Sequence, residues 1–170
     1  MEKKAFTLVE ILVYAAILGV ILTGLAGMFS WASSIRTKTE ALTETSSEAA
    51  KVMERMSFEI RQAESINFTQ SVFDSDNGRL SLQTKNYSQT EEILDFYLCS
   101  AKLCFKKGVD DPVFLTSDNL EISVLRFSRL GSDNNPSLEI SLNLAFKNPQ
   151  NRSEKKALVD LKSAVSLRAY

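Results

Sequence analysis

The first apolar segment of the chain is long and uninterrupted. Residues 11–32 are 22 consecutive positions without a charged side chain. As an α-helix, which rises by about 1.5 Å per residue, this segment would span roughly 33 Å and cross the hydrocarbon core of a bilayer. The pattern therefore predicts a membrane-spanning helix close to the N-terminus.

A second helical pattern follows without a break. Apolar residues recur every seven positions, with others beside this row: Ile35, Leu42, Ala49, Met56 and Ala63, flanked by Val52, Met53 and Ile60. No proline interrupts residues 6–111, so both patterns can belong to one helix over about residues 6–65. Its first half is apolar on all sides and its second half along one stripe only. This change predicts a helix that leaves the membrane and then packs against a domain, a simpler interpretation than a coiled coil.

After residue 65 the period changes from helical to alternating. Segments of alternating apolar and polar residues occupy positions 79–84, 93–98, 103–105, 120–128, 137–146 and 157–169. The connections at 130–137 and 147–156 are rich in turn-forming residues, and connections this short suit antiparallel neighbours. We therefore predict an α+β fold, in which the stripe of the long N-terminal helix packs on an antiparallel sheet.

The composition excludes several functional classes. The chain of 170 residues has 20 basic and 21 acidic side chains and no histidine. A balanced charge gives no indication of nucleic-acid binding, and the commonest general base and metal ligand is absent. No phosphate-binding loop, dinucleotide motif, nucleophile elbow or metal-ligand cluster is present. We expect no catalytic residues, no cofactor and no metal, and hence a protein that is not an enzyme.

Two local clusters have a plain structural interpretation. Residues 74–78 (DSDNG) resemble the start of a calcium loop, but the twelfth position, where such a loop needs glutamate, is Lys85. We expect a surface turn there. Lys102, Lys106 and Lys107 surround Phe105 and could touch DNA phosphates, but lysines at a solvated strand edge are the commoner arrangement. DNA is therefore an unlikely partner.

The two cysteines, Cys99 and Cys104, lie five residues apart in CSAKLC. Without histidine they cannot complete a tetrahedral zinc site from this chain alone. Outside the cytoplasm such a pair is typical of a disulfide that closes a small loop, which would contribute roughly 2 kcal/mol. Two free thiols on neighbouring strands remain the alternative.

One carboxylate, Glu10, lies at the start of the predicted membrane helix. A cleaved secretory signal has a shorter apolar core of about 7–15 residues, followed by a small-residue cleavage site that is absent here. A plain signal anchor fits the length of the helix. It leaves Glu10 as an unexplained cost of up to ~3 kcal/mol, because a carboxylate is unfavourable in hydrocarbon.

The sequence KKAFTLVE, followed by an apolar helix, resembles the N-terminus of type IV prepilins and pseudopilins. The resemblance implies that prepilin peptidase cuts between Ala5 and Phe6 on the cytoplasmic side and that Phe6 is then N-methylated. Ala5 stands where this family usually has glycine. Glu10 becomes the fifth residue of the mature chain and an assembly residue, which pairs with a terminal amine of its own or a neighbouring subunit.

Weaker similarity extends beyond the helix. RMSFEIRQAESI, FYLCSAKLCF, VLRFS and AVSLRAY resemble, in order, segments of the J-type minor pseudopilin of type II secretion and of minor pilins in type IV pili and competence systems. The implied organisation is a leader (1–5), a transmembrane and filament-core helix (6–32), and an amphipathic half-helix with a pilin-like sheet domain (33–170).

The resemblance also implies where the chain resides and what it contacts. The precursor would cross the inner membrane once, with its domain in the periplasm or cell exterior. The expected partners are other pilins or pseudopilins, the prepilin peptidase and methyltransferase, the inner-membrane assembly platform and membrane lipid. The alternative function is a signal-anchored extracytoplasmic binding or sensor domain.

Overall fold

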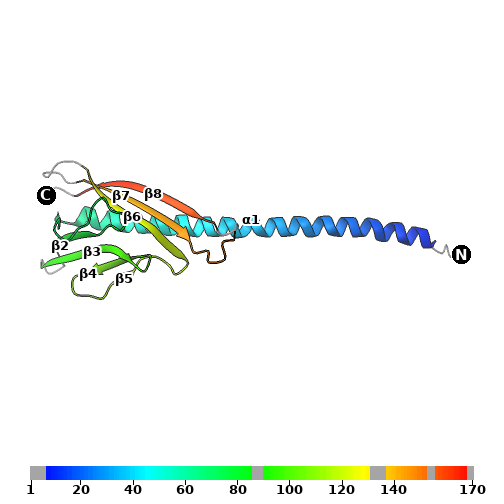
Figure 1. Ribbon diagram of the computed structural model, residues 1–170, viewed down its shortest axis with the longest axis horizontal. Coiled ribbons are helices and arrows are strands. Elements are labelled where there is room, and N and C mark those ends of the chain that lie inside the picture. Colours follow the sequence, from blue (N-terminus) through cyan, green and yellow to red (C-terminus); the bar gives the residue numbers. More distant parts are fainter. Residues whose placement is uncertain (1–6, 86–89, 131–136, 153–155, 168–170) are drawn as a thin grey trace.

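A long helix and a β-domain make up the computed structural model, which describes residues 7–85, 90–130, 137–152 and 156–167. The helix, α1 (Leu8–Gln62), extends far beyond the strands that gather around its C-terminal part (Figure 1). The strands are β1 (Ser65–Ile66), β2 (Leu80–Lys85), β3 (Glu91–Cys99), β4 (Lys102–Lys107), β5 (Val113–Phe114), β6 (Leu120–Leu130), β7 (Ser137–Phe146) and β8 (Leu158–Ser166). All pairings between strands are antiparallel, so the predicted α+β class is confirmed.

The helix ends earlier than its sequence pattern predicts. The expected start, Phe6, lies outside the described residues, and the expected end at residue 65 is wrong. Ala63 already has an extended backbone, with φ −67° and ψ 141°. The chain turns there because Ser65 and Ile66 form β1 and pair with Gln83 and Leu82 of β2. Pairing with the sheet therefore overrides the local preference for helix.

The buried stripe of α1 follows the predicted period only in part. It comprises Ala41, Thr45, Ala49, Val52, Met53, Met56, Ser57 and Ile60. Leu42, which belongs to the predicted row, is 37% exposed, so that assignment is wrong. Helix twist alone does not expose Leu42, because Ile60 lies five full turns later on the same face and is fully buried. At the turn of Leu42 the helix buries Ala41 instead.

The strands form two sheets, whereas the sequence suggested one. A five-stranded sheet has the order β1-β2-β3-β4-β5, and a three-stranded sheet has the order β6-β7-β8. The single-sheet expectation fails because other segments already occupy the outer edge of β6. The amide of Gly78 donates to the carbonyl oxygen of Leu125 at 2.7 Å, and the amide of Ile122 donates to that of Ala101 at 2.8 Å.

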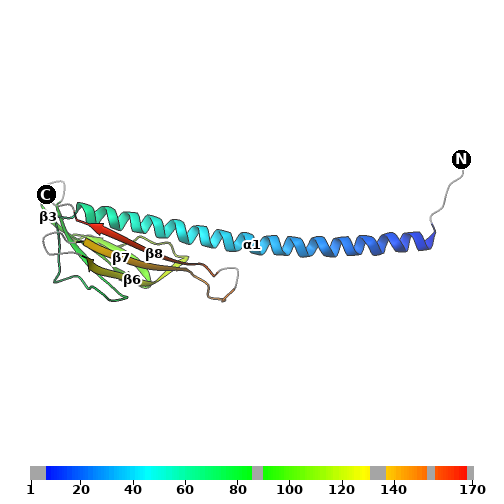
Figure 2. The same cartoon turned by 90° about the horizontal axis from the view of Figure 1, so that it is seen from above.

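The core lies between α1 and the inner faces of the two sheets, and β7 and β8 pack against the helix (Figure 2). The predicted alternation places the right side chains inside. Buried residues from five strands are Leu80, Leu82, Leu94, Phe96, Leu120, Phe127, Leu138, Ile140, Leu142, Leu144 and Val165. The helix stripe therefore covers the apolar face of the sheet, as the sequence predicts.

Candidate functional site

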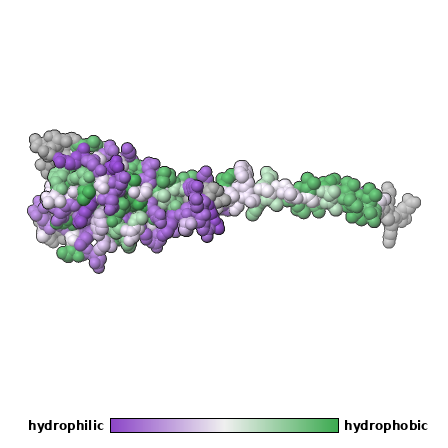
Figure 3. Space-filling model, viewed as in Figure 1, coloured by the Kyte–Doolittle hydropathy of each residue, from purple (hydrophilic) through white to green (hydrophobic). Residues whose placement is uncertain are grey.

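The N-terminal half of α1 is an exposed apolar surface. From residue 8 to residue 33 no side chain is buried, and Leu8, Phe29 and Trp31 are 78%, 81% and 67% exposed. Figure 3 shows this half of the helix in green and white, whereas hydrophilic residues cover most of the visible face of the domain. Each 100 Å² of apolar surface left in water costs about 2.5 kcal/mol, so this half of the helix requires lipid or other helices around it. By length and composition it can cross a membrane.

The first turn of α1 is capped by Thr7. Thr7 has an extended backbone (φ −79°, ψ 150°), and its hydroxyl oxygen accepts a hydrogen bond from the amide of Glu10 at 3.3 Å. Its carbonyl oxygen accepts from the amides of Glu10, at 3.1 Å, and Ile11, at 3.3 Å. Glu10 therefore lies in the first turn, where the positive end of the helix dipole favours an anion. The acid thus has a local stabilising environment within its own helix.

The sequence interpretation missed Thr7. The signal was available, because Thr7-Leu8-Val9-Glu10 has the spacing T-x-x-E of a capping box, in which threonine caps the helix and glutamate occupies its third position. Glu10 was interpreted only as an assembly residue. The structure adds that the backbone amide of Glu10 is held by the Thr7 cap, which places its carboxylate in the first turn.

Ala5 and Phe6 lie outside the described residues. The cut between them and the methylation of Phe6 therefore stay predictions, as does the pairing of Glu10 with a terminal amine. Glu10 lies in the first turn of α1 and is exposed, and this end of the helix is remote from the β-domain (Figure 1).

Comparison with known proteins identifies the same segment. Residues 1–26 match the family model described as the prokaryotic N-terminal methylation motif. No curated protein and no solved structure matches the chain. The match supports a type IV pilin-like protein, and the apolar helix that carries the motif is consistent with a membrane anchor in such a protein.

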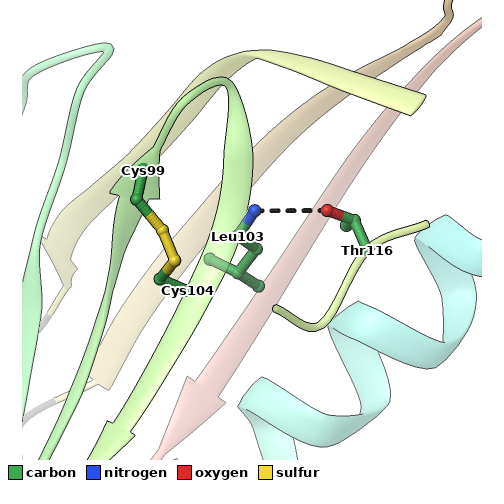
Figure 4. The surroundings of a disulfide bond; sticks show 4 residues. All are labelled: Cys99, Leu103, Cys104 and Thr116. Atoms are coloured by element: carbon green, nitrogen blue, oxygen red, sulfur yellow. Dashed lines mark hydrogen bonds between the residues drawn. A yellow bond between two sulfur atoms is a disulfide. The ribbon is translucent and has the colours of Figure 1, made fainter. Parts of the chain in front are cut away.

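The two cysteines form the predicted disulfide. Cys99 ends β3 and Cys104 lies in β4, with their Cα atoms 5.9 Å apart (Figure 4). The alternative of two free thiols is therefore wrong. Next to the bridge, the amide of Leu103 donates to the hydroxyl oxygen of Thr116 at 3.3 Å, which ties β4 to the connection before β6.

The lysines considered as DNA contacts are largely engaged within the domain. Lys102 forms an ion pair with Asp118 and lowers the pKa of that carboxyl, mainly through a hydrogen bond. Its ammonium also lies 5.0 Å from the ring centroid of Phe114. Lys107 pairs with Glu92 at 3.4 Å. This segment is thus a solvated strand edge with internal ion pairs.

The segment 74–78 forms a turn against β6. Asp74 has a positive φ of 56°, and Asp76 forms an ion pair with Arg126. Within the part of the chain that the structure describes, no cluster of three or more histidine, cysteine, aspartate or glutamate side chains could hold a metal ion.

Proposed function

We propose that this chain is a minor pilin or pseudopilin, a structural subunit of a type IV pilus-like or type II secretion filament. The supporting observation is a coincidence of two features in one helix. The methylation motif at residues 1–26 opens a helix of 55 residues. The first half of that helix exposes apolar side chains on all sides, and the second half packs against an antiparallel domain.

In this proposal each half of α1 has its own task. The apolar half holds the precursor in the inner membrane and later packs among the helices of other subunits, while the domain lies in the periplasm or outside the cell. Prepilin peptidase cuts before Phe6, and the new amine is methylated. The chain is a substrate of these enzymes and a client of the assembly platform; it has no catalytic role of its own.

Intact-mass analysis of the native protein tests the processing step. The expected mass is that of a chain that begins at N-methylated Phe6. A chain that retains Met1 to Ala5 in cells with an active prepilin peptidase would contradict the proposal and favour a signal-anchored binding or sensor domain.

The role of Glu10 needs a second test, because the same residue lies in the helix cap. Glu10→Gln removes the charge and keeps a side chain that can complete a capping box. We expect Glu10→Gln and Glu10→Ala to lower incorporation into the filament to a similar extent, while Thr7→Ala, which removes the hydroxyl cap, has a smaller effect. If Glu10→Gln assembled normally, a charge-based assembly contact would be ruled out.

A further inference from the structure

The three-stranded sheet has one open edge, formed by β8. β8 is its outermost strand and runs beside α1 (Figure 2). Where the β7–β8 ladder begins, the amide of Phe146 donates to the carbonyl oxygen of Ala157 at 2.9 Å. Because backbone groups alternate in direction along an antiparallel strand, every second residue after Ala157 also faces β7. The N–H and C=O groups of Asp160, Lys162 and Ala164 therefore point away from the sheet.

The opposite edge of the same sheet is closed, which makes β8 distinctive. Segment 74–78 exchanges backbone hydrogen bonds of 2.7–2.9 Å with Leu125 and Phe127 of β6. Among the described residues, no comparable bond reaches the outward groups of Asp160, Lys162 or Ala164, and all three residues are exposed. An unpaired edge of this length is a template for another strand.

A groove of about 510 Å³ runs between this edge and one flank of α1. Its helical side consists of residues from successive turns of α1: Ala50, Met53, Glu54, Ser57, Phe58 and Arg61. The twelve residues from Ala50 to Arg61 span about 16 Å from the first Cα to the last. A strand of about five residues has the same length, so the groove is long enough to hold one beside β8.

The groove offers apolar surface to one face of such a strand. Met53 is 9% exposed, and Leu161, which also lines the groove, is only half-buried. Phe58 is 51% exposed and forms part of the helical wall. In an added strand, alternate side chains would point toward these residues and the others toward solvent. The surface therefore suits a segment with apolar residues at every second position.

The charges around the groove favour an acidic residue in that segment. Lys162 and Arg61 line the groove, and neither forms an ion pair with any residue that the structure describes. Glu54 is the single acid among the lining residues. Opposite charges directly across from each other stabilise paired strands, so an acid opposite Lys162 would be favourable.

The β8 edge of a second copy of this chain does not fit this edge in a shared membrane. Two β8 strands related by a two-fold axis would run antiparallel, and the two α1 helices, each fixed beside its own β8, would then also run antiparallel. Two copies inserted in one membrane must instead point the same way. The β8 edge of a second copy is therefore not the occupant.

We propose that the β8 edge and its groove bind, by strand addition, an extended segment of a different subunit of the filament. That segment has apolar residues at alternate positions and an acid opposite Lys162. The inference rests on the proposed function, because it assumes that α1 holds the chain in a membrane or filament shared with that subunit.

A synthetic peptide tests the edge directly. The probe is a fluorescent peptide with the sequence of Leu158–Ser166, LVDLKSAVS. It alternates apolar and polar residues, carries an acid and, without a membrane helix, can run antiparallel to β8. Its aspartate can lie opposite Lys162 of the purified full-length chain in detergent micelles. We expect binding by fluorescence anisotropy, weakened about threefold or more when this aspartate is replaced by lysine. Absence of binding would overturn the proposal.

A pair of variants at one position separates backbone from side-chain effects. Lys162→Pro removes an outward N–H without touching the ladder with β7, and proline is tolerated at such edge positions. We expect it to weaken binding of the peptide about tenfold, whereas Lys162→Ala, which keeps the N–H, loses about threefold. Equal losses would exclude strand addition. If Lys162→Pro lowers the unfolding midpoint, Ala164→Pro with Ala164→Ser as its control replaces this pair.

The same variants in cells distinguish this inference from the proposed function. Lys162→Pro should be cut and methylated like the wild-type chain, yet lose association with other subunits that carry the N-terminal motif. If Lys162→Pro associates with those subunits as well as the wild-type chain does, this inference is overturned and the proposed function is unaffected. Failure of the wild-type chain to be processed would overturn the proposed function and leave the peptide result standing. If the wild-type chain associates with itself and Lys162→Pro abolishes this self-association, the occupant is a second copy, which contradicts our proposal.

Discussion

Removal of the disulfide should destabilise the domain by about 2 kcal/mol. Cys99 and Cys104 are separated by five positions in the sequence. Closing so small a loop lowers the entropy of the unfolded chain and contributes about 2 kcal/mol by the loop-closure relation. Alanine is the better replacement at both positions, because Cys104 is 1% exposed and a serine hydroxyl there would be buried.

The disulfide closes a turn whose backbone is strained and which also joins the two sheets. Ser100 and Ala101 connect β3 to β4 with φ angles of 53° and 60°, which are unfavourable by about 1 kcal/mol or more for residues other than glycine. The carbonyl oxygen of Ala101 also accepts a hydrogen bond from the amide of Ile122 at 2.8 Å, which joins the two sheets. Ala101→Gly in the alanine background should therefore recover about 1 kcal/mol.

Urea unfolding of the full chain in detergent, followed by near-UV circular dichroism, measures these changes. In thermal unfolding of the same samples, a loss of about 2 kcal/mol in the free energy of unfolding corresponds to a fall in Tm of about 4–8 °C for a protein of this size. The wild-type chain treated with a reductant is the control and should unfold at the same urea concentration as the double variant. An unchanged midpoint would refute the loop-closure estimate. A loss above about 5 kcal/mol would show that side-chain packing at Cys104 outweighs the cross-link.

Substitutions at Gly78 and Arg79, with Gly24→Ala as a control, test the packing of the domain. Gly78→Ala should destabilise it by about 1–3 kcal/mol, because the added Cβ would lie 2.7 Å from the carbonyl oxygen of Leu125. Gly24→Ala, with nothing within 4 Å of its Cβ, should leave the urea midpoint of the domain unchanged. Arg79→Ala should lower the free energy of unfolding by about 2 kcal/mol. The guanidinium of Arg79 lies 2.7 Å from the nearly buried carboxylate of Asp95, and the substitution leaves that carboxylate without its cation. Double replacement by Arg79→Met and Asp95→Leu should recover most of this loss, and a failure to recover would point to lost packing of Arg79 instead.

Periodicity in the sequence predicts most elements of the fold, because burial on one face imposes a repeat on each element. The alternation at 137–146 corresponds to β7, with Leu138, Ile140 and Leu142 inside. The seven-residue row locates the helix stripe but misplaces Leu42. Burial at a given turn of the helix also depends on which strands the helix meets there, and a periodic row does not specify those strands.

The division into two sheets could not be predicted from periodicity. It depends on which segment occupies the outer edge of β6, and that segment, 74–78, lies about fifty residues earlier in the chain. Its sequence indicates a turn, but nothing in it specifies that Gly78 bonds to Leu125. The alternation within a strand reports which face is buried and carries no information on which neighbour its edge meets.

The sequence locates the N-terminal motif, since residues 1–26 match the methylation family. The processing roles of Ala5 and Phe6 and the assembly role of Glu10 stay predictions. The motif alone does not reveal the cap formed by Thr7, because it accounts for the acid as a charge in lipid and not as part of a helix end.

The helix end and the membrane make different energetic contributions at Glu10. A helix N-terminus stabilises a nearby anion by about 0.3–1 kcal/mol at an exposed position. A carboxylate within hydrocarbon is unfavourable by up to ~3 kcal/mol, and less near the membrane surface. The cap is therefore sufficient for a precursor whose Glu10 stays near the surface, and insufficient once the helix lies among other apolar helices. In the proposed function, the amine created at Phe6 supplies the additional positive charge at the stage when assembly buries the acid. Processing would thus precede assembly for an electrostatic reason, since the cut places a positive amine four residues from Glu10, whereas the nearest lysines of the uncut chain, Lys3 and Lys4, are seven and six residues away.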